Sequence, residues 1–470
     1  MQSPKIDRLL ARLRIGMATS AALGQALGAS QSWMSKTLRD LARDRRVIKL
    51  GYTRGARYAL RRNVEAIGSA WPLRRVDRAG HIEELGTLYA LAAHQYYLEP
   101  DDGATAIGFT GGGVSTSLPY FLQDQRPGGF LGRAVPLRYP ELRLPQRVVD
   151  WTDDHYLRYL TLRGSDAVGD LILGRVAFDE SIAQQRHAAH MDIEQRALRY
   201  PQLAEEVMQG GLPGSSAHGE HPKFTALLKD ANGERHVLVK FSPPKDSAVG
   251  RRWSDLLHAE HYAHQILQTA GIPAASSRIV CAANRTFLEV DRFDREGACG
   301  RIGVTSLLAI DTACYGLLDH WIAAATRLRN DDRIDAQTLE QIRLVATFGA
   351  LIANTDRHFG NLAFYDKYDG RFALAPIYDM LPMLFAPEHD QLSVRIFDPP
   401  DPSSDTLSVW AQARALAENY WRGLARDSVD KDSADEVSSI SDDFRQLAAA
   451  CLNTLEKLPR IGAYAARPLP

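Results

Sequence analysis

The sequence has few cysteines and no long apolar run, and each absence excludes a class of protein. Its four cysteines lie far apart and form no CxxC pair: Cys281, Cys299, Cys314 and Cys451. This spacing argues against a disulfide framework or a zinc ribbon and fits a reducing cytosol. No apolar run approaches the roughly 20 residues of a membrane span, and the N-terminus lacks the apolar core and cleavage site of a signal peptide. We therefore expect a cytoplasmic protein without a membrane partner.

The net charge of −1 hides an uneven distribution of charge along the chain. Residues 1–62 contain 14 Lys or Arg and 3 Asp or Glu, whereas the remainder contains 42 Lys or Arg and 54 Asp or Glu. A basic head on an acidic body predicts a polyanionic partner for the head alone. The 470 residues, with 45% hydrophobic and 24% charged residues, are typical of a globular protein of about two to four domains.

Residues 1–62 have the pattern helix, helix, turn, helix and basic hairpin. Apolar spacing predicts helices over 6–13, 19–27 and 30–41, followed by strands over 47–50 and 57–60. This order resembles a winged helix-turn-helix, whose third helix enters the major groove while the wing contacts phosphate or the minor groove. The residues expected to face DNA are Gln31, Ser32, Ser35, Lys36 and Arg39 on the third helix, and Arg54 and Arg57 on the wing. The alternative is a winged helix used for protein contacts.

The segment after the head gives few functional signals. Its periodicity predicts helices over residues 81–97 and 153–162. The triple glycine at 111–113 lacks the GK[ST] of a phosphate-binding loop and predicts a tight turn. His187 and His190 lie among Gln and Arg residues without further metal ligands, so we expect no metal there.

The catalytic half opens with a Gly-rich stretch over residues 210–223, followed by strands predicted over 224–228 and 237–241. The second strand carries Lys240. A Gly-rich loop, a hairpin and a strand-borne lysine form the layout of a kinase nucleotide lobe.

A helix predicted over residues 253–268 carries Glu260, which we expect to pair with Lys240. Asp255 and Glu289 are competing partners, and a solvated helix carboxylate is the simpler alternative for Glu260.

Asp356, Asn361 and Asp379 follow helices predicted over residues 307–325 and 339–352, and a mostly helical stretch over 409–459 comes after them. Phosphoryl transfer needs one carboxylate to orient or deprotonate the attacking hydroxyl, and an Asn oxygen and a second carboxylate to hold Mg²⁺ against the phosphates. A single Asp here would be an ordinary turn residue. The three together, preceded by Lys240, predict Mg²⁺-dependent phosphoryl transfer.

From about residue 75 to 460 the chain resembles the HipA-like serine/threonine kinases, the toxin components of bacterial toxin–antitoxin systems linked to growth arrest and persistence. The motifs that carry the resemblance are Ser117-Leu118-Pro119, Gly164-Ser165-Asp166-Ala167-Val168-Gly169, Ser216-x-x-Gly219-x-x-x-Lys223, Lys240, Asp291-Arg292-Phe293-Asp294-Arg295, Asp356-x-His358-x-x-Asn361 and Tyr378-Asp379. With its basic head, the chain looks like the YjjJ-type branch. The implied fold is α+β, with a winged helix-turn-helix (1–62), a HipA N-terminal subdomain (75–180), a nucleotide-binding lobe (210–295) and a helical catalytic lobe (296–465).

The resemblance also implies residue roles, with ATP and Mg²⁺ as cofactors. Asp356 looks like the catalytic Asp, Asn361 and Asp379 like the metal ligands, and Lys240 like the phosphate-binding lysine. The other implied nucleotide contacts are Gly219, Lys223, Glu260, Asp291, Phe293 and His358. The implied partners are a protein acceptor, such as a translation component, and an antitoxin.

Ser216, with Ser215 as a second candidate, falls where members autophosphorylate a serine of the Gly-rich loop and switch the kinase off. A phosphate adds about −1.5 to −2 charge and would repel the triphosphate site.

The chain departs from the best-known members at Gly360, where they have Lys, so a cation near the γ-phosphate is missing. The resulting loop is closer to that of phosphoinositide kinases, which leaves a non-protein acceptor open. His218 and His221 lie in the Gly-rich loop and are expected to be solvated.

Two other functions are weighed. One is a DNA-binding transcription regulator whose kinase-like half senses nucleotide. The other is a nuclease, for which no separate paired-carboxylate motif stands out.

Overall fold

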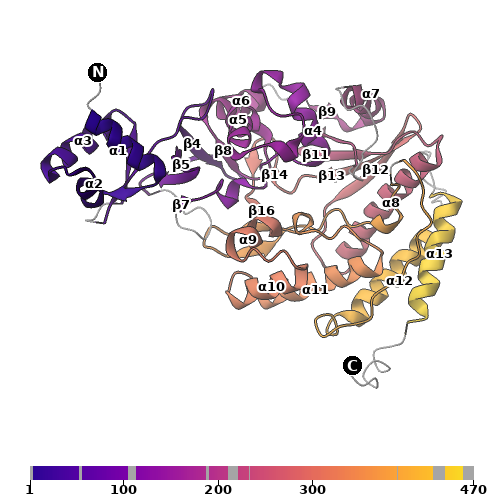
Figure 1. Ribbon diagram of the computed structural model, residues 1–470. Helices are drawn as coiled ribbons and strands as arrows, with labels where there is room; N and C mark the ends of the chain where they lie inside the picture. The colour runs from indigo at the N-terminus through magenta and orange to yellow at the C-terminus, as the bar shows by residue number, and fades with distance from the viewer. Residues whose placement is uncertain are drawn as a thin grey trace.

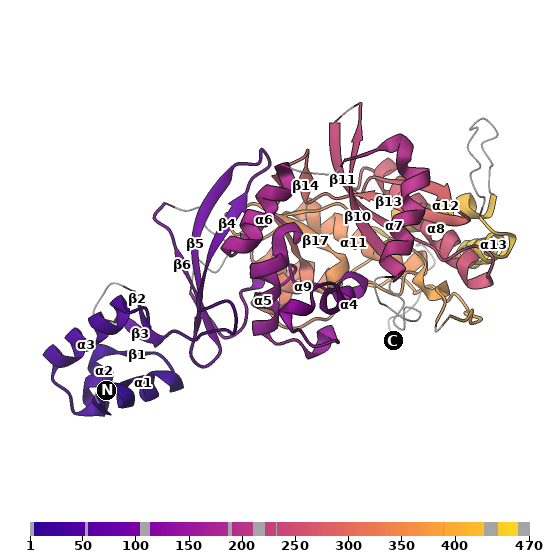
Figure 2. The ribbon, with the colours of Figure 1, turned by 90° about the horizontal axis from the view of Figure 1, so that it is seen from above.

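The computed structural model describes residues 4–51, 55–103, 113–186, 190–209, 221–231, 233–388, 390–426 and 440–458. A small N-terminal head is followed by a middle region built on a sheet and by a larger C-terminal region, which contains the predicted catalytic residues and is called the catalytic region for that reason (Figures 1 and 2). The expected α+β class is confirmed by this mixture of helices and sheets. Within the described ranges, no helix is both long and apolar enough to cross a membrane. The predicted site residues Arg54, Ser215, Ser216 and Gly219, together with His218, lie outside the described residues.

The head consists of α1 (Pro4–Ile15), β1 (Ala18–Thr19), α2 (Ser20–Leu27), α3 (Gln31–Arg43), β2 (Val47–Leu50) and β3 (Arg57–Leu60). Local capping sets the helix ends. The Ser30 hydroxyl accepts a hydrogen bond from the backbone N–H of Trp33, and Gly28 ends α2 at φ 55°. One face of α3 is buried through Met34 and Leu38, so its other face is left to solvent.

The head is joined directly to the middle region by backbone hydrogen bonds and apolar packing. The N–H of Ala92 donates to the Leu60 carbonyl at 2.8 Å, and the N–H of Arg62 donates to the Ala90 carbonyl at 2.9 Å. Ile48 from the head packs with Leu91 from the middle sheet. The head is therefore fixed to its neighbour rather than held by a free linker.

The middle region is a sheet of order β7-β6-β5-β4-β8 with two helices packed beside it. Its elements are β4 (Ala70–Val76), β5 (Ile82–Leu91), β6 (Gln95–Pro100), β7 (Val114–Ser115), α4 (Gly129–Arg138), α5 (Asp153–Arg163), β8 (Leu171–Leu173) and α6 (Arg175–Arg186). The helix predicted over 153–162 is confirmed by α5.

The helix predicted over residues 81–97 is wrong, because β5 and β6 occupy that stretch. Buried Leu85 and Leu88 are three residues apart, as on a helix, since the pairing of β4 with β5 slips by one residue near Gly86. Gly86 has φ 145°, and a Cβ there would lie 2.2 Å from the Glu99 carbonyl oxygen. The irregularity hides the two-residue period of a strand.

The first catalytic lobe is a sheet of order β12-β13-β11-β10-β9 with α7 (Arg196–Gln209) and α8 (Ala248–Thr269) packed against it. Its strands are β9 (Met191–Asp192), β10 (Lys223–Asp230), β11 (Gly233–Phe241), β12 (Ser277–Ala282) and β13 (Arg285–Asp291). Short strands β14 (Arg295–Glu296) and β15 (Gly300–Arg301) follow. β10 and β11 form the predicted hairpin, which delivers Lys240 to the middle of the sheet.

The second lobe is mainly helical and contains the largest apolar core. Its elements are β16 (Val304–Ser306), α9 (Leu307–Cys314), α10 (Trp321–Asn330), α11 (Ala336–Leu351), β17 (Ala363–Asp366), β18 (Phe372–Leu374), α12 (Trp410–Arg426) and α13 (Asp442–Glu456). The single helix predicted over 307–325 is wrong, because the chain turns between α9 and α10. Buried Asp311 accepts hydrogen bonds from the backbone N–H groups of Leu317 and Leu318, both at 3.0 Å, and stabilises this turn.

Two of the sequence motifs meet at the contact between the middle region and the catalytic lobes. Arg292 donates to Asp166 at 2.8 and 2.9 Å, and Arg295 donates to Asp166 at 2.9 Å and to Asp294 at 2.7 Å. The N–H of Gly169 donates to Asp294 at 3.1 Å. These motifs therefore form an ionic interface between regions that are about 125 residues apart in sequence.

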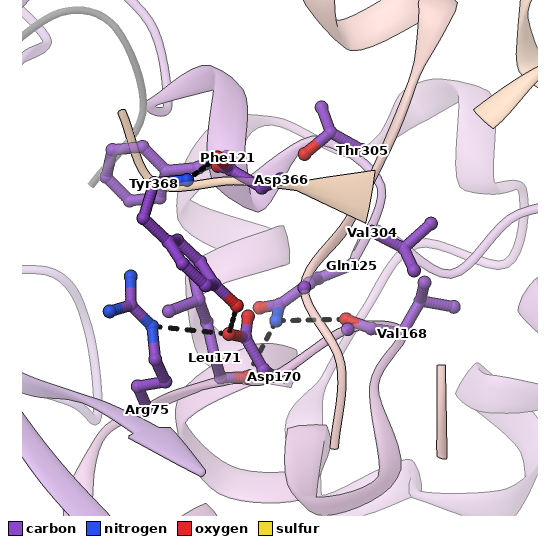
Figure 3. A pocket seen from close by; sticks show the side chains of 12 residues that line it. Arg75, Phe121, Gln125, Val168, Asp170, Leu171, Val304, Thr305, Asp366 and Tyr368 are labelled. Atoms are coloured by element: carbon purple, nitrogen blue, oxygen red, sulfur yellow. Dashed lines mark hydrogen bonds and ion pairs between the residues drawn. The ribbon is translucent and has the colours of Figure 1, made fainter. Parts of the chain in front are cut away.

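A cavity of about 20 Å³ lies at the same contact, lined by Arg75, Asp170 and Tyr368 among others. Figure 3 shows the Tyr368 hydroxyl and the Arg75 guanidinium converging on Asp170, at 2.5 and 3.2 Å. This volume suits about one water molecule and excludes a nucleotide. The cavity thus belongs to the interface and not to a substrate site.

Replacing Asp294 by Ala is expected to cost about 3–5 kcal/mol of folding free energy, because Arg292 and buried Arg295 would lose the buried one of the two carboxylates that they share. Chemical denaturation measures this loss, with Asp369→Ala at an exposed Asp–Arg pair as the matched control. Equal stability of the two variants would contradict the interface described above.

The same interface predicts a loss of stability in acid. Burial alone raises the pKa of Asp166, but Arg292 and Arg295 outweigh burial and lower the pKa to about 2. Since the pKa of Asp in the unfolded chain is about 3.9, the stabilisation that ionised Asp166 contributes is complete above about pH 4 and is lost as pH falls toward 2. Asp166→Asn should flatten the stability profile in that window.

Candidate active site

Lys240 lies at the centre of the candidate active site, where it contacts two carboxylates. Its Nζ donates to Oε1 and Oε2 of Glu260 at 2.6 and 2.7 Å, and also to Oδ1 of Asp379. Lys240 is 4% exposed and Glu260 is fully buried. Burial by itself lowers the pKa of Lys240, but the Asp379 and Glu260 carboxylates outweigh it and raise the pKa. Lys240 is therefore a fixed cation at neutral pH.

Neither competing partner reaches Lys240. Asp255 accepts hydrogen bonds from the N–H and the hydroxyl of Ser441 at 2.8 and 2.6 Å. Glu289 lies on the other face of the sheet and accepts from Tyr200 at 2.6 Å and from Arg235 at 2.5 Å. The structure thus brings Lys240 together with Glu260.

Asp379 has a backbone φ of 52°, in the left-handed region that costs most residues energy. Burial by itself raises the pKa of its carboxyl, but Lys240 and Lys223 outweigh burial and lower the pKa well below the usual range. The carboxylate is therefore ionised, as a metal ligand must be.

Asn354, which the sequence analysis gave no role, joins the catalytic loop to Asp379. It is 1% exposed; its Oδ1 accepts from the N–H of Asp356 at 2.9 Å and its Nδ2 donates to the Asp379 carbonyl at 3.3 Å. The first of these bonds has the i to i+2 spacing of an Asx turn, so the Asn-x-Asp pattern was a usable signal. The second joins residues 25 positions apart and could only be seen in the fold.

Asp356 lies on an exposed loop, with its side chain 49% exposed. The Nε2 atom of His358 lies 3.9 Å from its Oδ1, while Nδ1 of His358 accepts from the Gly360 N–H at 3.0 Å. A Cβ at position 360 would lie 2.9 Å from Cε1 of His358. Gly360 therefore leaves room for the His358 ring beside Asp356.

Asn361 is 6% exposed and donates from Nδ2 to the Asp356 carbonyl at 2.8 Å, which directs its Oδ1 away from that carbonyl. The Tyr378 hydroxyl donates to the Gly360 carbonyl at 2.5 Å and holds the Asp379 segment against this loop. The described residues contain no group of three or more His, Cys, Asp or Glu arranged for a metal. One amide oxygen and one carboxylate instead fit Mg²⁺ that completes its shell with nucleotide phosphate and water.

Phe293 and Asp291 differ in where their side chains lie. The Phe293 ring packs against Tyr378, with ring centroids 5.6 Å apart, next to Asp379. Asp291 pairs across the ladder with Val237, so its side chain lies on the opposite face of the sheet from Lys240. The Asp291 carboxylate accepts hydrogen bonds from Arg235 and Arg278. The side chain of Asp291 thus lies on the face of the sheet away from Lys240, and a contact of this hinge residue with the nucleotide stays a prediction.

Lys223 and His221 lie at the start of β10, beside Lys240. Lys223 pairs with Lys240 across the ladder, so the two side chains share one face of the sheet. His221 is only 8% exposed and packs edge-on against Trp253, with ring centroids 3.9 Å apart. The expectation that His221 is solvated is wrong, because α8 covers it.

The residues expected to face DNA lie together on the head, apart from this site. Gln31, Ser32, Ser35, Lys36 and Arg39 are all exposed on α3, and Arg57 is exposed at the start of β3. This exposed face is the one that α3 does not use for core packing.

Comparison with known proteins places this arrangement in a family. Residues 67–182 match the model of the YjjJ-like toxin middle domain, and residues 215–450 match that of the HipA-like C-terminal domain. The Escherichia coli (strain K12) protein named Toxin YjjJ is 35% identical over 454 residues, covering 95% of this chain and 98% of the relative.

Solved structures give a likeness of fold. HipA of Shewanella oneidensis MR-1, solved with HipB and operator DNA, has a TM-score of 0.51 at 16% identity, covering 82% of this chain and 97% of that one. The Helicobacter pylori proinflammatory kinase CtkA has a TM-score of 0.34 at 14% identity, covering 52% and 89%, which is too low to support an argument. The family models and the E. coli relative show that the chain belongs to the YjjJ-like branch of the HipA-like toxin family.

Proposed function

We propose that the protein is an ATP- and Mg²⁺-dependent serine/threonine kinase with a DNA-binding head. The observation that carries the proposal is the contact of Lys240 with both Glu260 and Asp379, which joins the two lobes at one buried cation. In kinases a strand-borne lysine paired with a helix glutamate binds the α- and β-phosphates, and a nearby aspartate binds the metal.

In this mechanism Lys240 neutralises phosphate charge, and Glu260 holds the Lys240 side chain in place. Asn361 and Asp379 would hold Mg²⁺, which when bound neutralises charge on the transferred phosphoryl group. Asp356, held by Asn354 and flanked by His358, orients the acceptor hydroxyl and accepts its proton.

The experiment that tests the proposal is incubation of the full chain with γ-labelled ATP and Mg²⁺, followed by mass-spectrometric mapping of phosphosites on the chain and on lysate proteins. We expect phosphate on Ser216 or Ser215 and on a serine or threonine of another protein, with a translation component as the leading candidate. Label that reaches lipid or nucleotide but no protein would contradict protein-kinase activity and favour the non-protein acceptor.

The exposed face of α3 supports DNA binding by the head in the manner of a winged helix-turn-helix. The solved HipA relative is in a complex with HipB and operator DNA, which supports DNA, and an antitoxin, as partners here as well.

Removing the charges of Lys36 and Arg39 is expected to weaken binding to a 30-base-pair duplex. The slope of log binding constant against log salt concentration should become less steep by about 1 per lost phosphate contact. Fluorescence anisotropy over a range of salt concentrations measures both quantities. Arg14→Ala, at an exposed cation on α1, is the matched control. Duplex affinity that is the same for Lys36→Ala/Arg39→Ala as for the native chain would contradict a DNA-binding α3.

A second candidate is a transcription regulator whose kinase-like half only senses nucleotide. The direct junction of the head with the middle sheet favours it, since a fixed head transmits changes in its neighbour. It predicts that ATP alters DNA affinity while no protein becomes labelled. Labelled Ser216 would contradict it.

A further inference from the structure

His221 is a buried polar side chain that has no polar partner among the residues that the structure describes. It is 8% exposed, and neither Nδ1 nor Nε2 has a hydrogen-bond partner in those ranges. Its only close ring contact in the described part of the chain is the edge of Trp253. A buried imidazole left unpaired costs free energy comparable to a lost hydrogen bond, so the site is incomplete as it stands.

The strand register places His221 toward the candidate nucleotide site. Lys223 pairs with Lys240, and the Phe241 N–H donates to the Pro222 carbonyl at 3.1 Å, so the pairing of the two strands continues to residue 222. Because side chains alternate along a strand, His221 lies on the same face as Lys223 and Lys240. That face is the one from which Lys240 reaches Asp379.

The surroundings of His221 select the chemistry of its ligand. Burial, followed by the nearby Lys240 and Lys223 cations, lowers the pKa of His221 well below its ordinary value, so the ring is neutral and offers one N–H donor. A site that combines two lysines with a neutral N–H donor suits an anion with several acceptor oxygens. Mg²⁺ prefers oxygen ligands, which argues against the ring as a metal ligand.

We propose that His221 donates a hydrogen bond to a phosphate oxygen of the bound nucleoside triphosphate and so completes the phosphate site formed with Lys240 and Lys223. The inference rests on the proposed kinase function. It adds a positioning residue to that function and predicts that the contribution of His221 is confined to the phosphates and does not extend to the base.

The test compares His221→Phe, which keeps the packing on Trp253 but has no donor, with His221→Gln, which keeps a donor. Calorimetric titration of the full chain, with Mg²⁺ present, measures affinity for a non-hydrolysable ATP analogue and for adenosine. We expect His221→Phe to bind the analogue about tenfold more weakly, the size of one hydrogen bond to a charged group, with adenosine affinity unchanged. His221→Gln should recover most of the loss.

The matched control is His258→Phe, since His258 lies on α8 and its Nε2 has no hydrogen-bond partner within the described ranges. It should leave both affinities unchanged. Equal analogue affinity in His221→Phe and the native chain, or an equal loss for adenosine, would overturn the inference while the kinase proposal stands. Failure of the native chain to bind the analogue at all would overturn the kinase proposal itself.

Discussion

Replacing Asp356 by Asn is expected to slow phosphate transfer by about 10²- to 10⁴-fold, the range found when a general base is removed. In the proposed mechanism the carboxylate orients and deprotonates the acceptor hydroxyl, and Asn keeps its shape without its basicity. The side chain is 49% exposed and the loop is held through the Asp356 backbone by Asn354, so the fold should be unaffected. Single-turnover transfer from γ-labelled ATP measures the rate, and thermal denaturation checks the fold.

Asp332→Asn provides the matched control, because Asp332 is 90% exposed and lies far along the chain from the loop. Its transfer rate should equal that of the native chain. Nucleotide affinity should also be unchanged in Asp356→Asn, since the proposed mechanism assigns Asp356 to the acceptor rather than to the phosphates. Unchanged transfer in Asp356→Asn would remove Asp356 from the mechanism.

The helices and strands of the head could be predicted from sequence because their signals are local. Thr19 and Ser30 cap the helices that follow them, and Gly28 ends α2, each acting within four residues of its own position. The same holds for the hairpin of β10 and β11, whose residues are close in sequence. Such local signals do not depend on how the rest of the chain packs.

Errors arose where long-range packing overrides the local pattern. The slip in pairing near Gly86 gives β5 a helical spacing of apolar residues, and Asp311 turns the chain where apolar content alone suggests one long helix.

In the candidate site, too, features set by local sequence could be predicted and features set by long-range packing could not. Residue types predicted Lys240, Asp356 and Asp379 as site residues, and the structure brings Lys240 and Asp379 into contact. The role of Asn354 and the burial of His221 depend on contacts with segments that are distant in sequence, and only the fold supplies these.

Replacing Lys240 by Met is expected to abolish nucleotide binding and also to destabilise the fold by about 3–5 kcal/mol. Removing one member of a buried ionic group leaves its partner's charge uncompensated, and Glu260 is fully buried. Calorimetric titration with an ATP analogue measures the first effect and urea denaturation the second. Lys367→Met, at an exposed lysine, should change neither.

The double variant Lys240→Met/Glu260→Gln separates the two roles of Lys240. A neutral Gln needs no counter-charge, so most of the lost stability should return, whereas nucleotide binding should stay absent because the cation is still missing. Lowering the pH should also restore stability to the single variant Lys240→Met. Burial raises the pKa of Glu260, so the folded state takes up a proton more readily than the unfolded state, and the deficit in stability relative to the native chain should shrink as the pH falls through the raised pKa. If stability and nucleotide binding returned together in the double variant, Lys240 would act only by neutralising Glu260, and the phosphate-binding role would be lost.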